Sequence, residues 1–414
     1  MTAFIKRNCI EEITKHLQSK EITILVGPRQ AGKTTIMLHI KEQLDKQGAK
    51  TLHLNIDQDD HRVYFNSQTD LVNYLKLYFG AEKGYLFIDE IQRLDNAGLF
   101  LKGIYDRNLP YKMIVSGSGS LELKEKIHES LAGRKRIFEI PTITFSEFIN
   151  FKTNYQFINK VNDFFKYDKT LPETLLQEYL YFGGYPKVVL ANTIEEKGDT
   201  IKEIYNSYVE KDIQNLIHIE KTENFINLVS VLSSQIGQLV NRTELSQTLN
   251  IDRETLKTYL WYLEKTFIIK RINPFFSNIR KELTKMPIFY FTDIGLRNYN
   301  RNQFMTPPNK TDGFLFQNFI YQLLKESKMF NNSKINFWRT KDGAEVDFIA
   351  HLGSDIIPIE VKNSSLDNID LNQSIHSFIA FYKPRKLYLI NKSLDSTLVV
   401  NNCEITAIPF FKLL

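Results

Sequence analysis

The chain is poor in the features that mark secreted, disulfide-bonded or membrane proteins. Its 414 residues include only two cysteines, Cys9 and Cys403, which lie near opposite ends. They form no spaced pattern, which excludes a disulfide scaffold and a cysteine-based zinc site. Apolar runs stop at about five residues, whereas a membrane-spanning helix needs about 20. The amino-terminal segment mixes charges with single apolar residues and has no signal-peptide core. We therefore expect a soluble, cytoplasmic protein without membrane contact.

Other signals are weak as well. The eight histidines have no metal-ligand spacing, and we find no internal repeat or low-complexity tract. The net charge of +5 is too small to indicate nucleic-acid binding by itself. The hydrophobic fraction of 43% is nevertheless enough to build cores, which excludes wholesale disorder. At roughly 100–200 residues per domain, the length predicts two to four domains.

The amino-terminal part alternates short apolar strands with helical stretches. Near-continuous apolar runs such as ITILV and YLFI are typical of strands buried on both faces. Strands that alternate with helices predict a parallel sheet with helices on both sides, so the fold class is α/β. The expected strands are Thr23–Val26, Thr51–Ile56, Tyr85–Ile88 and Met113–Val115.

The strongest motif is a phosphate-binding loop that follows the first strand and opens a helix. Glycines let backbone N–H groups approach phosphates, and the helix amino terminus adds partial positive charge. In this pattern Lys33 reaches the β- and γ-phosphates, and Thr34 offers a hydroxyl to Mg²⁺. The sequence therefore predicts ATP and Mg²⁺ as cofactors. The expected nucleotide-binding residues of the loop are Gly27, Pro28, Arg29, Gln30, Ala31, Gly32, Lys33, Thr34 and Thr35.

Two later strands end in polar residues that suit the same site. Asp89 and Glu90 follow an apolar strand, where Asp89 would hold the Mg²⁺ shell and Glu90 would polarise the attacking water. The strand 113–115 ends in a Ser-Gly run, and Ser116 or Ser118 would lie near the γ-phosphate. A Ser-Gly run is equally common as a plain turn.

The motifs GPRQAGKTT, LFIDEIQ, VSGSGS, SLAGR and FGGYP occur in this order. Together they resemble a large prokaryotic family of AAA-type ATPases fused to a carboxy-terminal domain of nuclease-like fold. The resemblance covers essentially the whole chain and implies ATP binding. It also places Ser116 or Ser118 at a polar sensor position and makes Arg134 the candidate arginine supplied in trans, which implies a homo-oligomer. The alternative for Arg134 is an ordinary surface arginine.

Residues 222–300 predict an amphipathic helix, followed by a short helix, a turn, a further helix and a two-stranded wing. A helix capped by Asp252 runs to Lys265, and the strands Phe267–Ile272 and Ile288–Phe291 follow. This order is typical of winged-helix DNA readers, although such modules also serve as protein contacts. Residues 270–301 carry seven basic and two acidic side chains. The candidate DNA-binding residues are Arg253, Lys257, Lys270, Arg271, Arg280 and Lys281.

The last hundred residues resemble a PD-(D/E)XK nuclease core. Glu360 and Lys362 stand on one face of a strand because their spacing is two, and Asp347 could join them from the adjacent strand. Such a pair of carboxylates is a possible second Mg²⁺ site, with Lys362 orienting the attacking water. Gln317 occupies the helix position where family members commonly carry an acid, so we expect weak or no cleavage. An exposed charged strand would have the same spacing.

These features lead to four expected domains and one main hypothesis. The protein would be a Mg²⁺-dependent ATPase that couples ATP hydrolysis to DNA or DNA–protein engagement. One alternative is a nucleotide-gated regulatory switch that holds a protein partner, and another is an ATP-controlled nuclease in defence or repair. The expected domains are an AAA-type P-loop core at 1–160, a helical lid at 161–221, a winged-helix module at 222–300 and a PD-(D/E)XK nuclease-like domain at 301–414.

Overall fold

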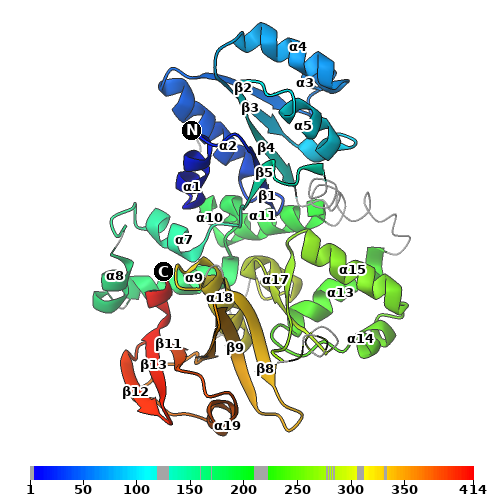
Figure 1. Cartoon of the computed structure of the whole chain (residues 1–414). Coiled ribbons are helices and arrows are strands. Elements are labelled where there is room, and N and C mark those ends of the chain that lie inside the picture. The colour runs from blue at the N-terminus through cyan, green and yellow to red at the C-terminus, as the bar shows by residue number, and fades with distance from the viewer. Residues whose placement is uncertain are drawn as a thin grey trace.

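The computed structural model divides into an upper and a lower half joined by helices (Figure 1). Among the described residues, no helix is both long and apolar enough to cross a lipid bilayer. The structure describes residues 4–118, 130–158, 160–168, 170–208, 222–276, 278, 280, 282, 285–304, 312–330 and 333–414.

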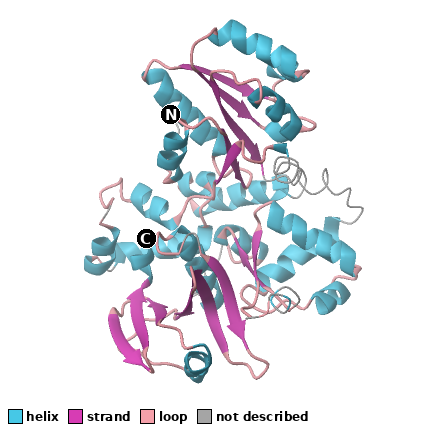
Figure 2. Cartoon of the chain, in the orientation of Figure 1, coloured by secondary structure: helices cyan, strands magenta, loops and turns pink. Residues whose placement is uncertain are grey.

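The upper half is a parallel sheet of five strands in the order β2-β3-β4-β1-β5 (Figure 2). Ile24 and Val26 of β1 enter one hydrophobic cluster, and Leu25 enters the other, so the strand is buried on both faces as predicted. Four of the strands match the expected ones, whereas β5 was not predicted. The strands are β1 Ile22–Gly27, β2 Lys50–Asn55, β3 Gly84–Asp89, β4 Tyr111–Ser118 and β5 Lys135–Glu139.

Helices cover both faces of this sheet. The helix α2 begins at Lys33, directly after the phosphate-binding loop, and packs on β2 and β4. The helices and 3₁₀ turns of this half are α1 Cys9–His16, α2 Lys33–Lys46, α3 Asp59–Arg62, η1 Val63–Phe65, α4 Gln68–Phe79, η2 Ile91–Arg93 and α5 Ala97–Tyr105.

A layer of helices lies between the two halves (Figure 1). Thr144 and Glu147 form a capping box that starts α7, and Pro186 stands at the first position of α10, where its fixed φ suits a helix start. The helices are α7 Phe145–Lys152, α8 Val161–Tyr167, α9 Thr170–Phe182, α10 Pro186–Leu190 and α11 Ile194–Ser207.

The segment from residue 222 contains three helices, a two-stranded antiparallel ribbon and a further helix. The predicted cap Asp252 accepts hydrogen bonds from the backbone of Glu254 and Thr255, and the predicted strand Ile288–Phe291 is confirmed. The elements are α13 Thr222–Ser234, α14 Arg242–Thr248, α15 Arg253–Lys265, β6 Ile269–Ile272, β7 Ile288–Phe291 and α17 Ile294–Asn300.

The carboxy-terminal part places a mixed sheet of six strands, in the order β12-β13-β11-β10-β9-β8, beside two helices. The strands β8, β9 and β10 are antiparallel, and β11 then runs parallel to β10. The elements are α18 Gly313–Glu326, β8 Lys334–Arg339, β9 Glu345–Leu352, β10 Asp355–Val361, α19 Gln373–Tyr382, β11 Lys386–Asn391, β12 Ser396–Val400, β13 Cys403–Pro409 and η4 Phe410–Leu413.

The lower half shares one large core. A single hydrophobic cluster joins Phe145 of α7, Leu228 of α13, Phe319 of α18 and Phe410 of η4. The rings of Phe145 and Phe319 meet edge to face at 5.1 Å. The helices α7 to α11, the segment from residue 222 and one part of the six-stranded sheet therefore share this core. Two smaller clusters, which contain Phe378 and Ile379 of α19, lie elsewhere on the sheet.

Candidate functional site

The phosphate-binding loop runs from the end of β1 into α2. Gly32 caps α2 with φ of +92°, a left-handed conformation that glycine adopts without strain. Lys33 is buried, and its ammonium donates to the carbonyl oxygens of Gly27 at 3.1 Å and Pro28 at 2.6 Å. The lysine thus lies inside the curve of the loop, where the loop backbone and the helix amino terminus favour an anion.

Asp89, the last residue of β3, is the polar centre of the site. It is 1% exposed, and its Oδ2 accepts from the Thr34 hydroxyl at 2.7 Å. Its Oδ1 accepts from the Ser116 hydroxyl and from the backbone N–H of Glu90. The structure brings together Thr34, Asp89 and Ser116, as the sequence predicted. The side chain of Ser118 lies outside the described residues.

Glu90 follows Asp89 but occupies a different environment. Its φ of 58° is left-handed, a strained conformation that non-glycine residues often adopt at functional sites. Its carboxylate accepts from the Gln92 amide and lines the same cavity as Lys33 and Thr34. Because Glu90 leaves the strand, Asp89 is buried while Glu90 faces the cavity.

The loop opens into a cavity of about 510 Å³, a size that suits a nucleotide. Its polar lining residues include Arg29, Gln30, Gly32, Lys33, Thr34, Thr35 and Glu90, with Arg7, Lys187 and Ser207 beyond the loop. Its apolar lining residues, here called the apolar wall, include Phe4, Ile5, Ile143, Pro186 and Leu190. The polar residues suit phosphates and the apolar wall suits a flat base. Sequence reasoning missed this apolar wall, because its residues come from three distant segments.

Arg7 is a second residue that sequence reasoning missed. It is buried and ion-paired to Glu147 at 2.9 Å. Its guanidinium also donates to the backbone carbonyls of Ala31 at 2.9 Å, Pro141 at 2.6 Å and Thr142 at 3.1 Å. Arg7 therefore fixes the phosphate-binding loop against the segment that enters α7. No motif marks an isolated arginine so close to the amino terminus.

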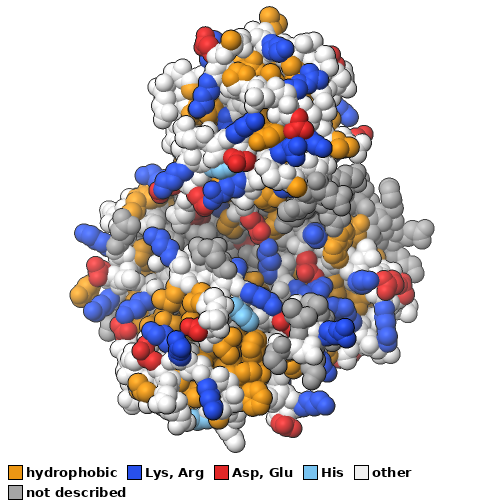
Figure 3. Space-filling view, in the orientation of Figure 1, with side chains coloured by type: hydrophobic (Ala, Val, Ile, Leu, Met, Phe, Trp, Pro, Cys, Tyr) orange, Lys and Arg blue, Asp and Glu red, His pale blue; other side chains and the backbone are white. Residues whose placement is uncertain are grey.

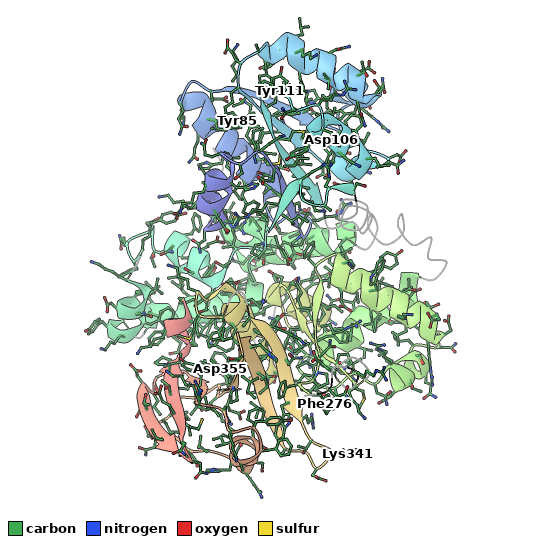
Figure 4. The ribbon with its side chains drawn as sticks, in the orientation of Figure 1. Tyr85, Asp106, Tyr111, Phe276, Lys341 and Asp355 are labelled. Atoms are coloured by element: carbon green, nitrogen blue, oxygen red, sulfur yellow. The ribbon has the colours of Figure 1, made fainter. Side chains whose placement is uncertain are left out.

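Arg134 lies at the opposite edge of the sheet from the loop. Its carbonyl accepts from the backbone N–H of Ile22, at the start of β1, whereas the loop begins at the other end of that strand. Five residues of strand separate the two points by about 16 Å. Its guanidinium pairs with Asp106, labelled in Figure 4, at 2.8 Å. From this position Arg134 does not reach the cavity of its own chain. Its role in trans stays a prediction.

The candidate DNA-binding residues divide into two groups. Arg253 and Lys257 are exposed on α15, where Lys257 contacts Glu254 at 3.3 Å. Lys270 instead pairs with Glu139 of β5 at 2.8 Å, and Arg271 pairs with Glu264 at 2.6 Å. Arg280 is exposed, and Lys281 lies outside the described residues. Figure 3 shows Lys and Arg side chains scattered over the visible face, with acidic side chains between some of them.

The segment between β6 and β7 packs against the carboxy-terminal sheet. Asn336 of β8 donates to the carbonyl of Asn273 at 3.0 Å and to the buried carboxylate of Glu282 at 3.0 Å. The backbone N–H of Phe275 donates to the carbonyl of Phe337. This segment therefore supports the sheet as well as joining the two strands of the ribbon.

The carboxylates of the candidate nuclease-like site do come together. Asp347 of β9 accepts from the Gln317 amide and from the backbone N–H of Val361 at 2.7 Å. Glu360 of β10 is buried and accepts from Lys362 at 2.8 Å. Burial and the neighbouring Glu360 carboxylate raise the pKa of Asp347 well above its ordinary value. Across the part of the chain that the structure describes, no group of three or more His, Cys, Asp or Glu side chains gathers to hold a metal.

Comparison with protein families assigns the segments separately. Residues 19–149 match the model of an AAA domain. These residues are thus similar to an AAA-type P-loop domain. Residues 173–305 match a domain of unknown function (DUF8612), and residues 312–411 match another (DUF4143). The AAA match covers the parallel sheet, the phosphate-binding loop, Asp89 and Glu90.

Relatives exist in bacteria and archaea. An uncharacterized protein of Haemophilus influenzae is 24% identical over 404 residues, covering 95% of this chain and 94% of its own length. One from Methanocaldococcus jannaschii is 26% identical, covering 82% of this chain and 74% of its own length. The phosphate import ATP-binding protein PstB 1 of Streptococcus pyogenes is 28% identical over 138 residues, which are 31% of this chain and 52% of that protein.

Solved structures share little beyond local similarity. A signal transduction ATPase with numerous domains from Pyrococcus horikoshii is 13% identical with a TM-score of 0.31, covering 79% of this chain and 46% of its own. AMPPCP-bound DnaA from Aquifex aeolicus is 14% identical with a TM-score of 0.30, covering 63% of this chain and 90% of its own. Scores this low carry no argument about function.

Proposed function

We propose that this protein binds ATP with Mg²⁺ in the cavity beside the phosphate-binding loop and hydrolyses it. The observation that carries the proposal is the meeting of Lys33, Thr34 and Glu90 in one cavity, with Asp89 directly behind Thr34. When ATP binds, the Lys33 ammonium would stop donating to the carbonyls of Gly27 and Pro28 and would donate to the phosphates, since an ionised oxygen is the stronger acceptor.

The Thr34 hydroxyl and the Asp89 carboxylate fit Mg²⁺ because both are hard oxygen donors at the end of the loop. When bound, the ion would neutralise charge on the phosphates. Ser116 holds the Asp89 carboxylate in place through its hydroxyl. Glu90 would accept a proton from the attacking water, because its carboxylate faces the cavity.

We further propose that nucleotide state controls the lower half, with DNA as its partner. Arg253 and Lys257 support this proposal, since both are exposed on α15, the second helix of a helix-turn-helix arrangement. Such cations would contact backbone phosphates. Lys270 and Arg271 support DNA binding less than the sequence suggested, because each is already ion-paired within the chain.

A nucleotide-gated protein switch is the second candidate. The pairing of Lys270 with Glu139 ties the ribbon to the AAA domain, and the segment between its strands packs on β8. A module held in this way suits a protein contact as well as a DNA contact. The ATP-controlled nuclease is the third candidate and rests on Asp347, Glu360 and Lys362.

One experiment separates the candidates. ATP turnover is measured with no DNA and with single-stranded, duplex and branched DNA, at two salt concentrations. Turnover that rises with DNA supports the main proposal, and the rise should shrink at high salt because counterion release weakens binding. Turnover that ignores DNA favours the protein switch, and metal-dependent nicking favours the nuclease. Absence of ATP binding by the wild-type protein would overturn all three.

A further inference from the structure

The apolar wall of the cavity depends on a turn that the lower half holds. Gly183 and Gly184 join α9 to α10, and Pro186 at the start of α10 lines the cavity. A Cβ on Gly32 of the phosphate-binding loop would lie 3.7 Å from the Pro186 ring, so the turn brings α10 against the loop. The position of Pro186 therefore follows from whatever fixes Gly183 and Gly184.

Asp293, the N-cap of α17, fixes this turn from 109 residues further along the chain. It is 2% exposed, and its Oδ2 accepts from the backbone N–H of Gly184 at 2.8 Å. Its Oδ1 accepts from the backbone N–H of Leu296 at 3.0 Å, which caps α17. The hydroxyl of Thr142 donates to the same carboxylate. One buried carboxylate thus joins the turn, the start of α17 and the segment before α7.

The turn packs so closely that it requires glycine. A Cβ on Gly183 would lie 2.3 Å from Oδ1 of Asp293, and one on Gly184 would lie 2.1 Å from the carbonyl oxygen of Ile143. The Ile143 N–H in turn donates to the Gly184 carbonyl at 2.6 Å. A Cβ on Gly295 of α17 would lie 2.1 Å from the carbonyl oxygen of Phe182. Only glycine fits at these contacts, because the added Cβ would meet backbone at Gly184 and Gly295 and the buried Asp293 carboxylate at Gly183.

Thr142 connects Asp293 to the phosphate-binding loop by a second route. Its carbonyl accepts from Arg7, and Arg7 donates to the carbonyl of Ala31 inside the loop. The carboxylate therefore reaches the cavity from two sides: through Gly184 to Pro186, and through Thr142 and Arg7 to Ala31. Both routes consist of buried hydrogen bonds. Moving one partner away would leave a buried polar group unsatisfied and would cost free energy.

Behind Asp293, α17 is anchored to the rest of the lower half. Asn298 donates to the carbonyls of Leu180 and Tyr181 in α9, and Arg297 donates to the carbonyl of Ser233 in α13. Residues 292 and 293 follow β7 directly. A displacement of α17 would therefore disturb its hydrogen bonds to α9 and α13 and the end of the antiparallel ribbon.

We propose that Asp293 is a positioning residue for the nucleotide cavity, through which the lower half holds the apolar wall and responds to nucleotide. This inference rests on the proposed nucleotide binding. Asp293 contacts no part of the cavity itself and acts through Gly184, Thr142 and Arg7. Nucleotide that binds against Pro186 reduces the motion of the Gly183–Gly184 turn. Because the Asp293 carboxylate bonds to both the turn and α17, the start of α17 becomes less mobile as well.

The test compares Asp293→Asn with Asp252→Asn. Both change an N-cap aspartate to asparagine, itself a good N-cap, but Asp252 is exposed at the start of α15 whereas Asp293 is buried. In Asp293→Asn, the single amide oxygen of the new side chain cannot accept from both Gly184 and Leu296. We expect Asp293→Asn to weaken binding of a fluorescent ATP analogue about tenfold and Asp252→Asn to leave it unchanged. A fluorescence titration measures the affinity, and melting without nucleotide reports stability.

Equal affinity of Asp293→Asn and wild type would overturn the inference. A measurement on the wild-type protein keeps it testable if Asp293→Asn fails to fold. Hydrogen exchange should slow at the amides of Gly184 and Leu296 when ATP analogue is added, and Lys33→Ala should lose this effect. If wild type binds the analogue but Leu296 exchanges at an unchanged rate, the inference fails while the proposed function stands. If wild type binds no analogue, the proposed function fails.

Discussion

At the scale of single residues, two neighbouring carboxylates take different roles because the backbone turns between them. Asp89 ends β3 in a buried position, where two hydroxyls and one backbone N–H donate to it. Glu90 has left the strand in a left-handed conformation and lines the cavity. Asp89 can therefore serve only as a fixed ligand or anchor, whereas Glu90 has access to water.

The first prediction separates binding from hydrolysis. Glu90→Gln should bind ATP with wild-type affinity but slow turnover about 10²–10⁴-fold, because an amide does not accept the proton. Lys33→Ala should lose ATP binding, because the β- and γ-phosphates lose their cation. Steady-state turnover and a nucleotide titration measure the two effects, with Glu42→Gln on the exposed face of α2 as the control. Wild-type turnover by Glu90→Gln would remove its role as base.

The second prediction concerns the carboxylates of the lower half. We expect no DNA cleavage with Mg²⁺ or Mn²⁺, because Gln317 and Val361 already donate to Asp347 and Lys362 donates to Glu360. A metal would have to displace these donors without help from a third acid. The assay incubates pure protein with several DNA forms beside the double variant Asp347→Ala/Glu360→Ala. Cleavage by wild type alone would promote the nuclease hypothesis.

At the scale of elements, α15 and the antiparallel ribbon differ in what their cations do. The charges of Arg253 and Lys257 are exposed on α15. The Lys270 charge joins β6 to Glu139 of the AAA domain, and the Arg271 charge joins β6 to Glu264 of α15. A basic residue in a sequence thus predicts that its charge has a partner. It does not predict whether that partner is DNA or an acidic residue of the same chain.

The third prediction follows from this difference. Reversing Arg253 and Lys257 to Glu should weaken DNA binding with little sequence dependence. The slope of the logarithm of affinity against the logarithm of salt concentration should also become shallower, because about two fewer counterions are released. Reversing Lys270 and Arg271 should instead lower the melting temperature, because each new carboxylate faces an existing one. Binding at several salt concentrations and thermal melting measure the two pairs. Unchanged DNA affinity in Arg253→Glu/Lys257→Glu would favour the protein switch.

At the scale of the whole molecule, the cavity opens near the junction of the halves and Arg134 lies at the far edge of the upper sheet. If an arginine in this position is to meet phosphates, they must belong to another copy of the chain. Its present partner, Asp106, is partly exposed like Arg134 itself. An exposed ion pair of this kind contributes at most about 1 kcal/mol, so it can be exchanged for a phosphate at little cost.

The fourth prediction tests this arrangement. Specific activity should rise with protein concentration, because each active site needs an arginine from a neighbour. Mixing Arg134→Ala with Lys33→Ala should restore part of the activity, since a Lys33→Ala copy can supply Arg134 to an intact cavity. Arg136→Ala, which removes a neighbouring exposed arginine, serves as the control. Full activity of a monomer at nanomolar concentration would contradict the prediction.

The sequence by itself determined the parts of this protein that local pattern encodes. The loop from Gly27 to Thr34, the Asp89–Glu90 pair and the first four strands were all predicted, since motif spacing and apolar runs reflect neighbours along the chain. The strand β5 was missed because only two of its five residues, Ile137 and Phe138, are apolar, so it has no long apolar run.

Only the tertiary structure decided what closes the cavity and what the charges contact. Arg7 meets Glu147 across 140 positions, and Asp293 meets Gly184 across 109. Lys270 meets Glu139 across 131 positions. Such contacts leave no periodic trace, because they depend on how packed elements bring distant backbone together. In the sequence Asp293 was one of two acids in a basic stretch, and in the fold it is buried against the Gly183–Gly184 turn and accepts from the Gly184 N–H.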